Sequence, residues 1–269
     1  MTILDEIAAK THLRVAKAKT NAPPDLVRSK ALEAYQARIV EAMPFEKALA
    51  APGLSFICEV KKASPSKGII AESFPYLEIA REYEAAGASA ISVLTEPEYF
   101  LGSDRYLQEI AAEANIPVLR KDFVIDPYQI YEAKLLGAHA VLLIAALLDA
   151  KTLAAYVKTA SELGLSALVE IHNETEAEQA LEAGARIIGV NNRDLKTFKV
   201  DTGVTARLKK RIPAGIITVA ESGIKSADDA REMKEIGVDA VLIGESLMRS
   251  ADKKQFLAEL KAAAGGNLN

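Results

Sequence analysis

The chain has 269 residues, of which 50% are hydrophobic and 26% are charged, and its formal net charge is -4. This is ordinary globular composition, and the acidic balance excludes the broad basic surface that nucleic-acid binding needs. The longest strongly apolar run, residues 140–148, is far too short to span a bilayer, so no membrane partner is expected.

A single cysteine, Cys58, excludes an intrachain disulfide and a cysteine-rich metal site. Cys58 lies inside an apolar run and is expected to be a buried hydrophobic side chain, not a nucleophile. The N-terminus is charged throughout and lacks the apolar core of a secretory signal. Together these features favour a cytoplasmic protein.

The first 50 residues are predicted to be helical, over residues 3–19 and 24–40. A separate domain of that length would bury too little surface to be stable alone. We therefore expect residues 1–50 to form an N-terminal helical extension that packs on a main domain of residues 51–269, giving one domain overall.

From residue 55 onward, short apolar runs rich in Val, Ile, Leu and Ala recur. Because they are apolar throughout and do not alternate, they suit strands that are buried on both faces of a parallel sheet. The eight runs cover residues 55–60, 90–94, 116–120, 140–144, 166–171, 187–191, 215–220 and 240–244.

The segments between these runs have helical spacing and clear end signals. Asp126 followed by Pro127 predicts a helix start, as do Asn173 and Ser226. A link of helix, glycine and immediate strand recurs five times, which fits a glycine that takes the left-handed turn at a helix end. The glycines expected to stop helices include Gly87, Gly137, Gly184 and Gly237.

Eight alternating strand–helix units between about residues 55 and 262 predict a single (β/α)8 barrel, the TIM-barrel fold. The alternative is a doubly wound open sheet. Such a sheet usually has fewer strands and often carries a G-x-G-x-x-G turn after its first strand, which this sequence lacks.

Working residues of such barrels sit where strands end. A lone lysine or glutamate there is ordinarily a solvated or structurally paired residue. Several together are different, because ionised groups beside buried runs are costly unless paired or used. Lysines and carboxylates at close range also shift each other's pKa values, which suits acid–base catalysis. The candidates for chemistry are Glu59, Lys61, Lys121, Glu170, Asn191 and Glu221, with Ser64, Arg193 and Ser222 beside them.

A phosphate site is predicted after the seventh and eighth strands. Gly223 and Gly244 would let backbone N–H groups approach an anion, and a short helix starting at Glu245 would direct its N-terminus at the same point. This position is the usual phosphate site of the fold. The glycines taken singly are also compatible with ordinary turns.

Metal chemistry is unsupported by the sequence. Of the three histidines only His172 lies near a strand end, without a nearby histidine or cysteine, and it is expected to be a loop or packing residue. Phe100 and Phe123, with Tyr99, fall in loops at the predicted mouth. They would either wall an aromatic substrate or simply cover the barrel, and the sequence leaves both interpretations open.

Seven segments in register resemble the indole-3-glycerol-phosphate synthase family of tryptophan biosynthesis. The resemblance covers nearly the whole chain, with no departure at a catalytic position. The segments are CEVKKASPSKG, LTEPEYFLGS, VLRKDFVIDPYQIYEA, LVEIHNE, IIGVNNRDLKTF, AESGI and VLIGESLMR.

The resemblance implies that 1-(2-carboxyphenylamino)-1-deoxyribulose 5-phosphate closes to an indole with loss of carbon dioxide and water, without a cofactor or metal. It implies a phosphorylated small-molecule substrate and a monomer, with other tryptophan-pathway enzymes as candidate partners. By motif position, Lys121 resembles the general acid of ring closure, Lys61 the partner of the substrate carboxylate and an acid for dehydration, and Glu170 the later general base.

The same resemblance implies supporting roles for the remaining candidates. Glu59 and Asn191 would orient the catalytic groups, and Glu221 would bind a hydroxyl. Arg193 and Ser222 would support the mouth, and Phe100 and Phe123 would lie near the anthranilate ring. The phosphate would be surrounded by Ser64, Gly223, Gly244 and the amide of Glu245.

In the first strand end, Glu59 and Lys61 flank Val60, so both should point toward the barrel axis while Val60 faces the helices. Lys62 should then point outward, and residues 64–68 should form a loop. Two rival functions remain: an aldolase that forms a Schiff base at Lys121, and a phosphosugar-binding barrel without turnover.

Overall fold

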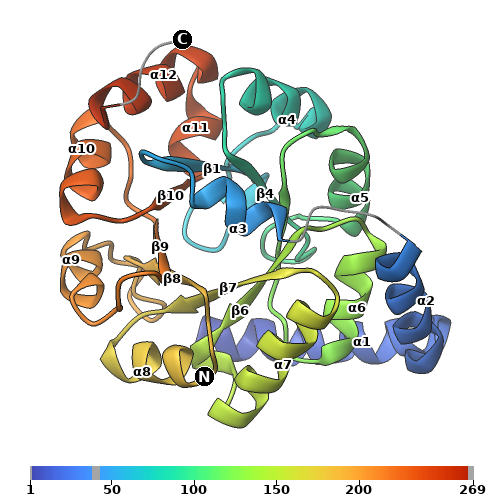
Figure 1. Ribbon diagram of the computed structural model, residues 1–269. Helices are drawn as coiled ribbons and strands as arrows, with labels where there is room; N and C mark the ends of the chain where they lie inside the picture. Colours follow the sequence, from blue (N-terminus) through green and yellow to red (C-terminus); the bar gives the residue numbers. More distant parts are fainter. Residues whose placement is uncertain (1, 38–42, 266–269) are drawn as a thin grey trace.

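The computed structural model describes residues 2–37 and 43–265. Within these residues, eight parallel strands close into one barrel surrounded by helices, as Figure 1 shows. The prediction of a (β/α)8 barrel is therefore confirmed. The barrel strands are β1 (Ser55–Val60), β4 (Ala90–Leu94), β5 (Val118–Lys121), β6 (Ala140–Ile144), β7 (Ser166–Ile171), β8 (Ile187–Asn191), β9 (Ile217–Glu221) and β10 (Ala240–Ile243).

The barrel is closed by β1, which pairs with β4 on one side and with β10 on the other. Three predicted strand boundaries shift slightly. The third strand begins at Val118, because Pro117 has no N–H to donate to a ladder, and it runs through Lys121. The seventh runs over residues 217–221, and the eighth ends at Ile243, because Gly244 already begins the next turn.

The helices of the barrel begin and end largely as predicted. Asp126, Asn173 and Ser226 each accept a hydrogen bond from a backbone N–H of the first turn. The four predicted stop glycines all have positive φ. The helices are α4 (Tyr76–Ala85), α5 (Asp104–Glu113), α6 (Pro127–Leu135), α7 (Ala150–Glu162) after the 3-10 turn η1 (Ala145–Leu147), α8 (Glu174–Glu182), α9 (Gly203–Lys209), α10 (Ala227–Ile236), α11 (Glu245–Arg249) and α12 (Lys253–Ala263).

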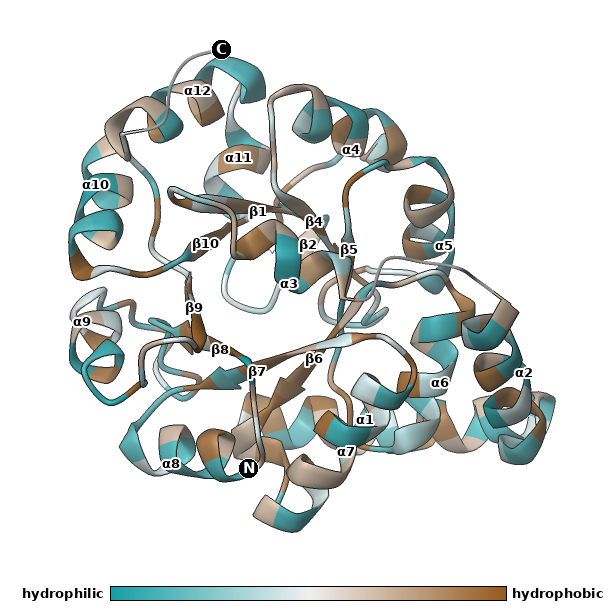
Figure 2. Ribbon diagram, viewed as in Figure 1, coloured by the Kyte–Doolittle hydropathy of each residue, from teal (hydrophilic) through white to brown (hydrophobic). Residues whose placement is uncertain are grey.

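Strand alternation divides the apolar side chains into two cores. Outward side chains such as Val60 and Val169 pack with the helices, while inward ones such as Ile57, Leu119 and Leu168 fill the barrel. In Figure 2 the strands at the centre are mostly brown, whereas the surrounding helices carry both hydrophilic and hydrophobic residues. Burial on both faces explains why the strands are apolar throughout.

The residues before β1 form α1 (Ile3–Asn21), α2 (Pro24–Ala37) and α3 (Pro44–Leu49). The second predicted helix ends at Ala37, and its expected residues 38–40 lie outside the described residues. α2 packs beside α6, and α3, which was not predicted, closes one end of the barrel with Phe45 and Leu49 (Figure 1). The division at residue 50 stays a prediction. Of the helices described, none is long and apolar enough to cross a membrane.

The loop predicted at residues 64–68 is instead a short antiparallel hairpin of β2 (Ala63–Ser64) and β3 (Gly68–Ile69). Gly68 takes a positive φ at its turn, which glycine adopts without strain. The hairpin is attached to the next loop, because the Ala63 N–H donates to the Phe100 carbonyl at 3.2 Å. The segment after β1 is therefore fixed to the mouth by backbone bonds.

Candidate active site

A cavity of about 870 Å³ lies at the carboxyl ends of the barrel strands. It is where parallel barrels place their working residues. All fourteen candidate residues from the sequence line it: Glu59, Lys61, Ser64, Phe100, Lys121, Phe123, Glu170, Asn191, Arg193, Glu221, Ser222, Gly223, Gly244 and Glu245.

The centre of the cavity is a lysine between two carboxylates. Lys121 Nζ lies 3.1 Å from Glu170 Oε2 and 3.3 Å from Glu221 Oε2. The three residues end β5, β7 and β9 or lie one residue before the end, and each points inward. Both carboxylates are buried and therefore lack bulk water to stabilise a negative charge. The positive charge of Lys121 stabilises it instead.

These contacts set the protonation states of the group. Burial works against the charged form of Lys121, but Glu170 and Glu221 outweigh it and hold the pKa of Lys121 above its ordinary value. Burial likewise opposes ionisation of Glu170, but Lys121 and then His172 hold the pKa of Glu170 well below its usual range. Burial, with nearby Glu170 and Glu59, raises the pKa of Glu221 to about 7. Of the two carboxyl groups beside Lys121, that of Glu221 therefore titrates near neutral pH.

A second ion pair lies beside the first. Lys61 Nζ bonds the carboxylate of Glu59, and both side chains face the cavity while Val60 packs with the helices, as the alternation predicts. Gly244 makes room for this pair. A Cβ at that position would overlap the Glu59 carboxylate and would lie 2.9 Å from Lys61 Nζ. Position 244 therefore requires a glycine so that the Glu59–Lys61 pair has room, whether or not its backbone N–H also binds an anion.

Glu170 is also held from its other side. Asn191 Nδ2 donates to Glu170 Oε1 at 3.2 Å, and His172 Nε2 lies 3.3 Å from the same oxygen. The other ring nitrogen of His172 lies 3.0 Å from Glu176 in α8. Burial disfavours the imidazolium, but the carboxylates of Glu170 and Glu176 raise the pKa of His172 to about 10.

The sequence predicts His172 to be a loop or packing residue and gives no expectation of its contact with Glu170. The available signal was its spacing. His172 lies two residues after Glu170 and follows the end of β7 directly, so its side chain returns to the same face.

The mouth beyond β8, β9 and β10 is shaped by unusual backbone. Ser222 and Gly223 follow β9 with φ of 66° and 95°, and Ser246 Oγ donates to the Ile224 carbonyl at 2.9 Å. The side chain of Glu245 turns toward two cations, with Lys67 Nζ at 3.4 Å and Arg249 Nε at 3.2 Å. This pairing offsets a negative charge where an anion is expected to bind.

Arg193 follows β8 and is fixed by its own loop. Its N–H donates to Asn191 Oδ1 at 3.0 Å and its guanidinium to the Phe198 carbonyl at 3.2 Å. Asn192 lies between Asn191 and Arg193 in the chain. Its side chain is buried, and its Nδ2 donates to the Ser222 carbonyl at 3.0 Å. The ends of β8 and β9 are therefore linked.

One side of the cavity is apolar. The rings of Phe100 and Phe123 lie 6.0 Å apart at their centroids, and Ile3, Leu4 and Ile7 of α1 line the same cavity. The sequence predicted the two rings at the mouth, but it did not place α1 there. An aromatic ligand would fit such a wall.

Cys58 is fully buried, and burial raises the pKa of its thiol, as expected for a hydrophobic side chain. Within residues 2–37 and 43–265, no group of three His, Cys, Asp or Glu side chains is arranged to hold a metal ion.

The fold and the site together define a class: a (β/α)8-barrel enzyme whose mouth holds paired lysines and carboxylates beside an apolar wall. Solved structures agree on the fold. A 3-hexulose-6-phosphate synthase superposes with a TM-score of 0.63 at 17% identity, covering 78% of this chain and 99% of its own. A thiamine phosphate pyrophosphorylase from Pyrococcus furiosus gives 0.60 at 19% identity, with 82% and 98% coverage.

Sequence comparison identifies the family. The family model for indole-3-glycerol phosphate synthase matches residues 4–260. An indole-3-glycerol phosphate synthase of Ruminiclostridium cellulolyticum is 56% identical, covering 97% of this chain and 100% of the relative. The one of Endomicrobium trichonymphae is 54% identical, with 96% and 99% coverage. The chain belongs to the indole-3-glycerol phosphate synthase family, as the resemblance predicted.

Proposed function

We propose that this cavity converts 1-(2-carboxyphenylamino)-1-deoxyribulose 5-phosphate into indole-3-glycerol phosphate, carbon dioxide and water by acid–base catalysis. The observation that carries the proposal is the placement of Lys121 Nζ within 3.3 Å of both Glu170 and Glu221, next to an aromatic wall. A buried, charged lysine can donate a proton to a substrate oxygen that gains negative charge during the reaction.

Ring closure comes first in the proposed sequence. The ring carbon that carries the carboxylate attacks the C2 carbonyl of the sugar, and Lys121 donates a proton to the carbonyl oxygen as the carbon–carbon bond forms. The pKa of Lys121 is held above its ordinary value, after burial is offset by Glu170 and Glu221, so the proton is present at neutral pH. Carbon dioxide then leaves, and its bonding electrons restore the aromatic ring.

Dehydration completes the indole. An acid protonates the C2 hydroxyl, which leaves as water, and a base removes a proton from the neighbouring C1. We assign Lys61 as the acid, since it lies beside Glu59, and Glu170 as the base, since Asn191 and His172 fix its carboxylate. Glu59 and Asn191 orient these groups, and Glu221 binds a substrate hydroxyl.

The remaining residues would hold the two ends of the substrate. Phe100 and Phe123 take the anthranilate ring, and Arg193 and Ser222 support the mouth. At the other end, backbone N–H groups would donate hydrogen bonds to the phosphate. The positive ends of the backbone dipoles favour an anion there, and glycines, which have no Cβ, allow it to approach the backbone closely. The phosphate residues of this proposal are Ser64, Gly223, Gly244 and Glu245 through its amide.

The proposed chemistry needs neither a cofactor nor a metal. We further propose that the chain works as a monomer in the cytoplasm, with residues 1–50 as an extension of the barrel and with other tryptophan-pathway enzymes as candidate partners. Sedimentation with and without those enzymes would test the assembly.

The decisive assay mixes the purified protein with the carboxyphenylamino-deoxyribulose phosphate and follows indole fluorescence. Appearance of the fluorescent product supports the proposal. Covalent trapping of substrate at Lys121 by borohydride would overturn it in favour of a Schiff-base aldolase. Tight substrate binding without fluorescence would favour a phosphosugar-binding barrel without turnover.

A further inference from the structure

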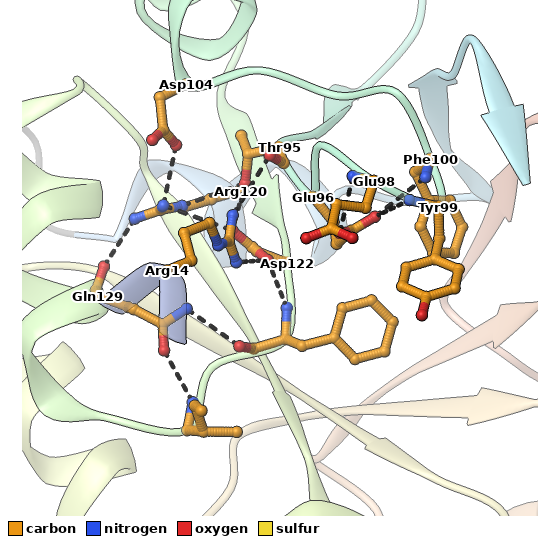
Figure 3. Close-up of polar contacts among 12 residues, drawn as sticks. Arg14, Thr95, Glu96, Glu98, Tyr99, Phe100, Asp104, Arg120, Asp122 and Gln129 are labelled. Atoms are coloured by element: carbon orange, nitrogen blue, oxygen red, sulfur yellow. Dashed lines mark hydrogen bonds and ion pairs between the residues drawn. The ribbon is translucent and has the colours of Figure 1, made fainter. Parts of the chain in front are cut away.

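Two loops of the mouth each carry one ring of the apolar wall and each fold around one buried carboxylate. In the loop after β4, Glu96 accepts hydrogen bonds from the N–H groups of Glu98, Tyr99 and Phe100 at 3.0, 2.7 and 3.0 Å. Figure 3 shows these three bonds meeting at the one side chain. The position of Phe100 is thus set by the carboxylate of Glu96.

In the loop after β5, the carboxylate is Asp122. It accepts the Phe123 N–H at 2.8 Å and the Thr95 hydroxyl at 2.7 Å, and Thr95 directly precedes Glu96. Asp122 therefore joins the two ring-bearing loops. It also separates Lys121, which points into the cavity, from Phe123 on the wall.

Two arginines balance the charge of Asp122. Arg14 of α1 donates at 2.6 Å, and Arg120 of β5 lies at 3.4 Å. Arg120 is fully buried and is itself held by Asp104 and Glu132 at 2.9 and 2.7 Å, and by the Gln129 carbonyl at 3.0 Å. In Figure 3 Arg120 contacts Asp104 and the Gln129 carbonyl, whereas Arg14 contacts Asp122.

The two arginines differ in what they tie together. Arg120 connects Asp122 to the barrel that surrounds it, whereas Arg14 belongs to α1 and comes from 108 residues earlier in the chain. α1 reaches the β4 loop as well, because Lys10 pairs with Glu98 and the Tyr99 hydroxyl donates to Glu6 at 2.7 Å. Its side chains Ile3, Leu4 and Ile7 then line the cavity next to the rings.

We propose that Asp122 and Arg14 are positioning residues: their ion pair locks the two ring-bearing loops against α1 and so sets the spacing of the aromatic wall that receives the carboxyphenyl end of the substrate. This inference rests on the proposed function for the identity of that ligand. The Asp122 carboxylate is fully buried and hydrogen-bonded at both oxygens, so its pair with Arg14 holds geometry more firmly than a pair of exposed side chains.

Two ligands separate this role from general stability. One is the substrate with its ketone reduced to an alcohol, which cannot undergo ring closure. The other is ribulose 5-phosphate, which lacks the aromatic ring. Arg14→Met removes the charge and keeps the aliphatic stem. It should weaken binding of the reduced substrate about tenfold by calorimetry, while binding of ribulose 5-phosphate changes less than about twofold.

Four further variants complete the test. Arg14→Lys should recover most of the lost affinity. Asp122→Asn should show the same ligand selectivity as Arg14→Met. The double variant should bind the reduced substrate no more weakly than the weaker-binding single variant does, since both substitutions remove the same interaction. Arg81→Met is the matched control, because Arg81 pairs with Glu113 at 2.7 Å in α5, away from the mouth, and it should bind both ligands as the unaltered protein does.

In turnover, Arg14→Met should raise KM by more than it lowers kcat, because Lys121 Nζ remains held by Glu170 and Glu221. Equal weakening of the two ligands, or unchanged binding of the reduced substrate, would overturn the positioning role. If Asp122→Asn does not fold, the comparison of Arg14→Met with Arg14→Lys still decides. Selective ligand binding without any turnover would overturn the proposed function alone.

Discussion

The two ends of the barrel are made from the same strands and carry opposite chemistry. β5 points Leu119 and then Lys121 inward, and β9 does the same with Val219 and Glu221. At the amino-terminal ends of the strands, α3 covers the barrel (Figure 1), and its Phe45 and Leu49 pack with the apolar side chains of the barrel interior. At the carboxyl ends, charged side chains surround a cavity of about 870 Å³.

One step of strand alternation separates side chains that stabilise the fold from those that line the cavity. Two residues along a strand advance the chain by only about 7 Å, yet the inward side chain changes from an apolar packing residue to a charged residue of the cavity. The barrel can hold charges at its mouth because the layers beneath are filled with apolar side chains. Variants at matched positions of the two ends should therefore have separable effects.

The largest effect on chemistry is expected from Lys121→Ala. Loss of the proposed acid should lower kcat by roughly 10³-fold or more. The fold should remain, because Glu221, whose pKa is about 7, can take up a proton when the lysine is gone. The fluorescence assay and urea unfolding would measure the two effects.

The matched control lies two residues earlier on the same strand. Leu119→Ala should cost about 2–5 kcal/mol of unfolding free energy and leave kcat nearly unchanged well below the melting temperature. Turnover of Lys121→Ala within a few-fold of the unaltered protein would show that the acid is misassigned.

At the opposite end, Phe45→Ala should cost about 3–5 kcal/mol of unfolding free energy, because Phe45 of α3 is fully buried against the barrel interior. The measurement is urea unfolding, with kcat determined in parallel at low temperature. A large fall in kcat without a loss of stability would contradict the separation of the two ends.

Within the mouth, Glu170→Gln separates an effect on catalysis from an effect on substrate binding. The amide keeps the shape of the carboxylate but cannot remove a proton, so kcat should fall by roughly 10²-fold. KM should change much less. The reverse pattern, a raised KM with kcat nearly retained, would make Glu170 a binding residue.

The smallest expected effect is a pH-dependent one at His172. Its pKa is raised to about 10 because Glu170 and Glu176 outweigh the cost of burial. The stabilisation is therefore fully present below the unfolded pKa of 6.5 and is lost as the pH rises through about 10.

His172→Gln should accordingly lower the unfolding free energy by on the order of 2 kcal/mol at pH 6, and by progressively less toward pH 10. Urea unfolding of both proteins across this range would measure the difference. A difference that does not vary with pH would show that packing, not charge, holds His172 in place.

The strands and the mouth could be predicted from the sequence because they depend on local patterns. Buried strands are apolar throughout, and a glycine ends the link from helix to strand in five of the units, so the eight units can be recognised in order. Polar residues such as Glu170 and Asn191 stand out because they interrupt or end these runs. Position at a strand end then places them at the same mouth.

The features that were missed depend on contacts between distant segments. Arg14 gives no local sign that it meets Asp122, and the positions of α1 over the mouth and α3 beneath the barrel follow from packing that no periodicity reveals. Arg120 carried an available signal, since a charged side chain between Leu119 and Lys121 in a buried strand must find partners. Short elements such as the β2–β3 hairpin fall below what residue patterns resolve.

The docking of α1 also fixes an order of assembly. α1 is synthesised before every loop on which it docks, and Asp122 follows Arg14 by 108 residues. Until β5 and its loop have emerged and paired, the apolar face that includes Leu4, Ile7 and Val15 has no barrel to cover it. A chain interrupted before that point would expose this face, the kind of surface through which unfinished chains aggregate or meet chaperones. The helix that completes the cavity is thus made before the loops on which it docks.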